Sequence, residues 1–110
     1  MNRRVTFLRN ADNKPVGCVV INVDRHNKRI EYQVSTLNPA DKFDREMARL
    51  LATGRLVESP FHLWLPNKAG LHEISRRVMQ HIATNKGIPN RSRKAAKTWL
   101  TKNLSPFFTV

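Results

Sequence analysis

The residues with the clearest chemical potential are basic side chains crowded near the end of the chain. Four positive charges fall within residues 91–97: Arg91, Arg93, Lys94 and Lys97. They occupy the expected start of a helix, where the dipole already presents partial positive charge and carboxylates would be favoured. No Asp or Glu occurs from Ile74 onward. A phosphate backbone would relieve this repulsion, so the segment predicts a nucleic-acid-binding surface.

Two further basic groups belong to this prediction. Arg76 and Arg77 lie on the preceding expected helix and complete a candidate nucleic-acid-binding set of six: Arg76, Arg77, Arg91, Arg93, Lys94 and Lys97. The expected hairpin tip 24–29 carries a secondary basic set: Arg25, Lys28 and Arg29. A tip of this composition can contact phosphates, but it is more typical of a plain polar hairpin turn. A solvated basic face without a ligand is the alternative for the helical set.

The overall charge favours the same class of partner. The 110 residues include 20 Lys and Arg but only 8 Asp and Glu, which gives a net charge of +12. Such an excess attracts polyanions. We therefore expect a nucleic-acid partner, with double-stranded DNA first, while RNA and an acidic protein stay open.

Catalytic patterns are weak by comparison. His72-Glu73-Ile74-Ser75-Arg76 begins like a zinc-protease helix, but Arg76 stands where the second His is needed. A general base could come from the histidines: His26, His62, His72 and His81. Neither paired carboxylates nor a Gly-rich phosphate loop accompanies them. We expect no catalytic residues, no metal and no cofactor, and keep a small hydrolase as the third hypothesis after nucleic-acid binding and inhibition of a protein.

The first third of the chain predicts an antiparallel meander of three strands. Residues 16–23 are apolar on both faces, which indicates a central strand. Residues 29–35 alternate and place Ile30, Tyr32 and Val34 on one side. Turns rich in Asn, Asp and Pro separate the strands.

A helix is expected to cover this meander. Asn38 and Pro39 form an N-terminal signal and Gly54 a C-terminal one. The expected buried stripe contains Phe43, Met47, Leu50 and Leu51. Within residues 57–66, Pro60 and Pro66 enclose a short apolar stretch, which predicts an extended crossover in which Phe61, Leu63 and Trp64 pack on the core.

Two more helices complete the predicted α+β domain. One is expected between Asn67 and Gly87 and the other from Ser92 to about Asn103. Their apolar stripes comprise Leu71, Ile74, Val78, Met79 and Ile82 on the first, and Ala96, Trp99, Leu100 and Leu104 on the second. The chain thus reads as one domain, 1–110, made of a β-β-β-α unit (1–56), a crossover (57–66) and a basic C-terminal helical pair (67–110).

Compartment signals are simple. Cys18 is the single cysteine, which excludes an intramolecular disulfide and predicts a buried, unreactive thiol. Neither a membrane span nor a signal peptide is expected, because no apolar run approaches the ~20 residues of a membrane helix. A cytoplasmic protein is the expectation. The tail carrying Phe107 and Phe108 can complete the core or serve as an interface, and a homodimer stays open.

Residues 79–98 resemble a helix-turn-helix. Ile82, Ala83, Gly87 and Ile88 match its apolar, small and turn positions. Lys86 and Arg93 stand where apolar residues are expected. The resemblance implies recognition of duplex DNA, with about half of the diagnostic positions filled.

A second resemblance involves Val34-Ser-Thr-Leu-Asn-Pro-Ala-Asp-Lys-Phe-Asp-Arg45 and Leu51-Ala-Thr-Gly-Arg-Leu56. This Asn-Pro-x-Asp-x-Phe and Gly-Arg-Leu pattern is similar to small uncharacterised proteins of tailed bacteriophages. It implies a protein that takes part in host takeover in the bacterial cytosol. Such a protein would act on nucleic acid or inhibit a host protein, namely a transcription, nuclease or defence complex.

Overall fold

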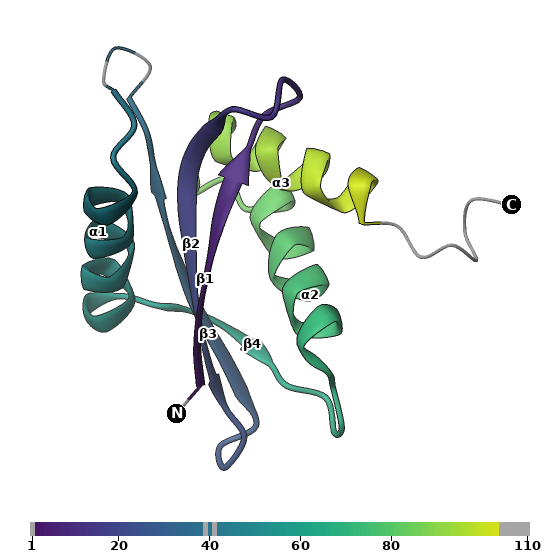
Figure 1. Cartoon of the computed structure of the whole chain (residues 1–110). Helices are drawn as coiled ribbons and strands as arrows, with labels where there is room; N and C mark the ends of the chain where they lie inside the picture. The colour runs from purple at the N-terminus through teal and green to yellow at the C-terminus, as the bar shows by residue number, and fades with distance from the viewer. Residues whose placement is uncertain (1, 39, 41, 104–110) are drawn as a thin grey trace, which may run out of the picture.

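Four antiparallel strands form one sheet in the order β1-β2-β3-β4 in the computed structural model, which describes residues 2–38, 40 and 42–103. The strands are β1 (Asn2–Arg9), β2 (Pro15–Asp24), β3 (Arg29–Thr36) and β4 (Phe61–Trp64). Three helices complete this part of the chain: α1 (Arg45–Glu58), α2 (Leu71–Thr84) and α3 (Asn90–Lys102). Figure 1 shows α1 on one side of the sheet and α2 with α3 on the other. The predicted α+β class is confirmed.

Side-chain oxygens shape the two hairpin turns. The Oδ1 atom of Asn10 accepts hydrogen bonds from the backbone N–H groups of Asp12 and Lys14. In the second turn Asp24 accepts from the backbone and side chain of Asn27. The bond from the N–H two residues after Asn10 defines an Asx turn, and Asp24 makes a similar bond with the N–H three residues on. The three-stranded meander therefore forms where the sequence predicts it.

The crossover prediction for residues 57–66 is wrong in one respect, because the segment contains a strand. β4 pairs antiparallel with β3, with Trp64 opposite Arg29 and Phe61 opposite Tyr32. Phe61 and Leu63 pack against the core as expected, whereas Trp64 is 65% exposed. Alternation explains the difference, since successive side chains of a strand point to opposite faces.

The main core lies between the sheet and the helical pair α2–α3. Val19, Ile21 and Tyr32 are fully buried there. The predicted stripe of α2 supplies Ile74, Val78, Met79 and Ile82, all fully buried, but Leu71 at the start of the helix is 48% exposed. Ala95 and Ala96 of α3 complete this core, with Trp99 and Leu100 partly buried. The inward residues of the meander thus pack against α2 and α3. The prediction that the helix now called α1 covers them is wrong.

A smaller core lies beneath α1 on the opposite face of the sheet. It joins Cys18 and Val20 of β2 to Ala52 and Leu56 of α1. Three hydrogen bonds fix α1 to its surroundings: Ser35 Oγ to Ala48 O at 2.7 Å, Arg55 Nη1 to Val34 O at 2.8 Å, and Gln33 Nε2 to Ser59 O at 2.8 Å. The predicted stripe is therefore wrong: Met47, Leu50 and Leu51 are about half exposed.

The ends of α1 also differ from the prediction. The helix begins after Asp44, whose Oδ1 accepts from the N–H of Met47 at 3.1 Å, and not after Asn38. It continues through Gly54 to Glu58, and none of the described glycines has a positive φ. Asp44 provides a true cap, because its side chain satisfies a free N–H of the first turn. Pro39 lies outside the described residues.

α3 begins two residues earlier than predicted, at Asn90 after Pro89, and ends at Lys102. Its buried Ser92 forms a 2.6 Å hydrogen bond to the hydroxyl of Thr36 at the end of β3. Leu104, Phe107 and Phe108 lie outside the described residues. Within those residues, no helix combines the length and the apolar character needed to cross a membrane.

Candidate nucleic-acid interface

The first two basic residues of α3 are held by the fold. Arg91 is partly buried and donates from Nη1 to the carbonyl oxygen of Leu37 at 2.6 Å. Arg93 is also partly buried, and its Nε atom is enclosed without a hydrogen-bond partner. Arg93 occupies a position of the helix-turn-helix pattern where an apolar, inward-facing residue is expected, and its side chain is partly buried. These two side chains are therefore less available to a ligand than their charge suggests.

Lys94 and Lys97 form the exposed part of the predicted set. Both side chains are solvent-exposed on α3. They line a depression of about 430 Å³ together with Thr98 and residues 10–12 of the first hairpin turn. Figure 1 shows this turn beside α3. We call Lys94, Lys97 and the adjoining turn residues 10–12 the α3 surface.

The two arginines of α2 do not act as one group. Arg76 and Arg77 are both exposed, but neighbouring positions on a helix point ~100° apart. Arg77 forms a 3.4 Å ion pair with Glu73 one turn earlier. It also lines a groove next to β4, away from the α3 surface. The six predicted residues thus divide among three environments.

The groove next to β4 is a feature that the sequence reasoning missed. It has a volume of about 350 Å³ and is lined by Leu63, Trp64, Arg77, Gln80, His81 and Thr84. The signal that could have found it is the alternation of Phe61-His62-Leu63-Trp64, which predicts that Trp64 stays outside the core that Phe61 and Leu63 join. We call it the Trp64 groove.

A buried aromatic cluster supports the wall of this groove. His81 Nδ1 is hydrogen-bonded to the hydroxyl of Tyr32, and the amide of Asn85 donates to the same hydroxyl at 3.5 Å. The rings of Tyr32 and Phe61 lie 5.3 Å apart. Burial raises the pKa of Tyr32 to about 12, although the hydrogen bond from Asn85 lowers it. His81 is therefore fixed in orientation by its hydrogen bond to Tyr32.

Two of the three basic residues of the predicted hairpin tip are partly held by contacts within the fold. Arg25 donates from Nη2 to the carbonyl oxygen of Ala69 at 3.2 Å, which ties the tip to the segment before α2. The Nε atom of Arg29 is enclosed without a partner. Lys28 is exposed and adopts a φ of 52°. In the sheet, Arg29 lies opposite Trp64, so the tip adjoins the Trp64 groove and not the α3 surface.

One histidine lies next to a carboxylate. His62 Nε2 is 3.3 Å from Glu31 Oε2, and Asn22 donates to the other oxygen of Glu31 at 3.1 Å. These residues stand in one row across β2, β3 and β4. Glu73, the acid of the zinc-protease-like segment, instead pairs with Arg77. Among the described residues, no group of three or more His, Cys, Asp or Glu side chains could hold a metal ion.

Cys18 is buried between β2 and α1. Desolvation raises the pKa of its thiol to about 11, although the positive charge of Arg49 lowers it. A thiol with so high a pKa is protonated at neutral pH and is a poor nucleophile. This placement agrees with the packing role predicted from the sequence.

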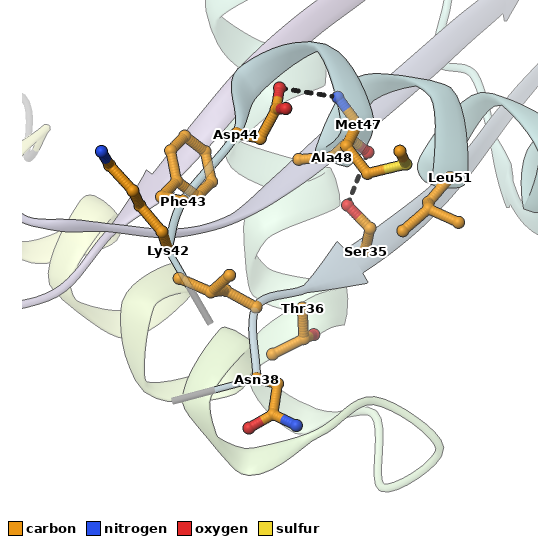
Figure 2. Close-up of a pocket in the computed structure, with 10 residues that line it drawn as sticks. Ser35, Thr36, Asn38, Lys42, Phe43, Asp44, Met47, Ala48 and Leu51 are labelled. Atoms are coloured by element: carbon orange, nitrogen blue, oxygen red, sulfur yellow. Dashed lines mark hydrogen bonds between the residues drawn. The ribbon is translucent and has the colours of Figure 1, made fainter. Parts of the chain in front are cut away.

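An apolar pocket opens at the N-terminal end of α1. It has a volume of about 210 Å³, and Figure 2 shows Phe43, Met47 and Leu51 around it, with the Ser35 to Ala48 hydrogen bond at its base. Phe43 contacts the edge of the Phe7 ring, with centroids 5.9 Å apart. The pocket continues onto the exposed apolar residues of α1: Met47 (54% exposed), Leu50 (54%), Leu51 (50%) and Val57 (73%). We call this set the α1 stripe.

Comparison with known proteins adds no relative. No protein-family model, curated protein or solved structure matches the chain.

Proposed function

We propose that the protein binds nucleic acid, chiefly through its phosphates, and that Lys94 and Lys97 of the α3 surface make the leading contacts. The role is binding and not catalysis. Arg76 contributes from the exposed side of α2, while Arg91 and Arg93 support the helix and add to the positive field. The helix-turn-helix resemblance is compatible with this role, because α3 presents its exposed basic residues outward.

The observation that carries the proposal is that few of the basic side chains form ion pairs with acidic ones. Within the described residues two ion pairs form, and Arg77 is the single Lys or Arg that takes part in one. Four of the eight acidic residues lie in the segment 41–58, which also holds four basic residues and is therefore neutral. The net charge of +12 thus lies outside the segment 41–58. Uncompensated Lys side chains favour a polyanion, because each phosphate contact releases counterions.

Salt titration tests this proposal. Binding of a labelled duplex and of its separated strands should weaken steeply as salt rises above about 0.1 M. The double substitution Lys94→Gln and Lys97→Gln should lower the slope of log affinity against log salt by roughly 1.4 to 1.8, because each contact contributes ~0.7 to 0.9. Gln preserves helix propensity, so the fold should survive.

A matched control removes the same charge from the other side of the sheet. Lys42 and Arg49 are exposed on the α1 side, and their change to Gln should leave the slope close to that of the wild type. Equal losses from both double variants would show a diffuse field without a defined surface. No binding to any nucleic acid at about 0.1 M salt would reject the proposal.

The α1 stripe favours a second candidate, inhibition of a host protein. An exposed apolar patch of this kind commonly marks a protein interface. The stripe lies on the neutral part of the chain, where nucleic acid has little to bind. The resemblance to phage proteins suggests a bacterial protein as the partner.

A pull-down from bacterial lysate separates the two candidates. A partner retained after nuclease treatment, and lost from the variant Leu50→Lys with Leu51→Lys, would support the inhibitor. A partner lost after nuclease treatment, and lost from the Lys94 and Lys97 variant, would support nucleic-acid binding.

A further inference from the structure

Trp64 is the most conspicuous exposed aromatic side chain of the described residues. It ends the edge strand β4 and is 65% exposed. Trp is usually well buried, because its large ring gains much from leaving water. Here nothing in the fold requires the ring, since Phe61 and Leu63 already supply the inward face of β4. An exposed Trp in this setting is suited to a ligand that covers it.

The surroundings of Trp64 combine an apolar floor with polar groups. Leu63 supplies the apolar contact, while Gln80 and Thr84 bring an amide and a hydroxyl from α2. His81 is oriented by its bond to Tyr32. An amide and a hydroxyl can each donate and accept hydrogen bonds. Such an arrangement suits a flat ring with polar edges, which is the description of a nucleobase.

Positive charge approaches the same place from two elements. Arg77 lines the groove from α2, and Arg29 lies opposite Trp64 on β3. Lys28 is exposed at the adjoining tip. A base stacked on Trp64 would bring its flanking phosphates toward these cations, and Arg77 would then share its charge between a phosphate and Glu73. The secondary basic set of the hairpin tip thereby gains a use that is independent of the α3 surface.

We propose that the Trp64 groove binds an unpaired base of a single-stranded nucleic acid by stacking it on Trp64. This inference rests on the proposed nucleic-acid binding and deepens it. Bases in a duplex are stacked on one another, so their faces are not available to a protein ring. A stacking Trp therefore selects single strands over duplexes. Stacking itself is tolerant of sequence, because every base has a π-face.

Fluorescence provides the test, because the chain has two tryptophans. The variant Trp64→Phe retains Trp99 alone, so the difference between wild type and variant reports Trp64. Single-stranded DNA and RNA of one sequence should quench the Trp64 signal, and the duplex should not. The two single strands show whether the sugar matters. The variant Trp64→Ala should bind single strands about 5- to 150-fold more weakly, which corresponds to ~1 to 3 kcal/mol per stacked base.

Two comparisons make the result decisive. Trp64→Phe should recover part of the lost affinity, because Phe still offers a ring, and duplex binding should be unchanged in both variants. If Trp64→Ala binds single strands as the wild type does, or if the duplex quenches Trp64 equally, the stacking proposal is overturned while nucleic-acid binding stands. If the wild type binds no nucleic acid at all, the proposed function fails as well. Thermal unfolding confirms that the variants are folded.

Discussion

The guanidinium of Arg91 donates a hydrogen bond to the carbonyl oxygen of Leu37 at 2.6 Å, across 54 residues of sequence. The contact joins the first turn of α3 to the end of β3, next to the hydrogen bond between Ser92 and Thr36. A residue that the sequence assigns to phosphate binding thus has a structural partner. Arg91 also shows why a basic cluster in sequence need not be a basic surface in space.

Changing Arg91 to Ala should therefore reduce stability. A hydrogen bond that involves a charged group contributes ~1.5 to 3 kcal/mol, and its loss would leave the Leu37 carbonyl without this donor. Urea unfolding of the variant should show a loss of that size. The control is Lys94→Ala, which removes a charge from the same predicted basic set but at an exposed position. It should change the free energy of unfolding by less than about 0.5 kcal/mol. Equal effects would mean that Arg91 is as exposed as Lys94.

The first three strands and α2 could be predicted because their sequence periods are unambiguous. Residues 29–35 alternate strictly, and only one register buries Ile30 and Tyr32. In α2 the apolar residues recur on one side of the helix, and all of the predicted stripe except Leu71 is buried. In both elements the sequence pattern itself predicts which side chains are buried.

α1 could not be placed in the same way because it carries two competing stripes. Met47, Leu50 and Leu51 are the larger residues, yet Ala48, Ala52 and Leu56 face the sheet. Small side chains let α1 approach the sheet closely, and hydrogen bonds from Ser35 and Arg55 then stabilise that position. Such tertiary contacts are absent from the sequence pattern. The Trp64 groove was missed for a related reason, because it depends on β4 joining the sheet.

Two glycines should respond in opposite directions to Ala. A Cβ on Gly17 would lie 2.5 Å from the backbone oxygen of Ser35, so Gly17→Ala forces β2 and β3 apart. Overpacking of this kind costs ~1 to 3 kcal/mol. A Cβ on Gly54 meets nothing within 4 Å inside α1, so Gly54→Ala should add about 0.5 to 1 kcal/mol. Thermal unfolding measures both, and destabilisation by Gly54→Ala would restore the predicted helix end at that residue.

Alkaline pH should weaken the fold through Tyr32. Burial raises the pKa of its hydroxyl from 10.0 to about 12, so the unfolded chain releases the proton first. The associated stability is complete below pH 10 and is lost as pH rises toward 12, amounting to roughly 2 to 3 kcal/mol. Urea unfolding between pH 9 and 12 should show this decline. In Tyr32→Phe the decline should be smaller by that amount, and an unchanged profile would contradict the assignment.

The thiol of Cys18 should react slowly in the native protein. It is buried, and desolvation raises its pKa to about 11, so little thiolate is present at neutral pH. A disulfide reagent should label it at the rate of opening of α1 and promptly in denaturant. Fast labelling without denaturant would instead indicate an accessible, reactive thiol.

The two leucines of α1 give a matched test of which side of this helix faces the sheet. Leu56 is 6% exposed and belongs to the core with Cys18, whereas Leu50 is 54% exposed. The same change to Ala should therefore cost ~2 to 5 kcal/mol at Leu56 and less than about 1 kcal/mol at Leu50. Because both sites lie inside one helix, propensity cancels from the comparison. If Leu50→Ala proved the more damaging change in urea unfolding, α1 would have to be rotated, and the α1 stripe would become core and lose its role as a binding surface.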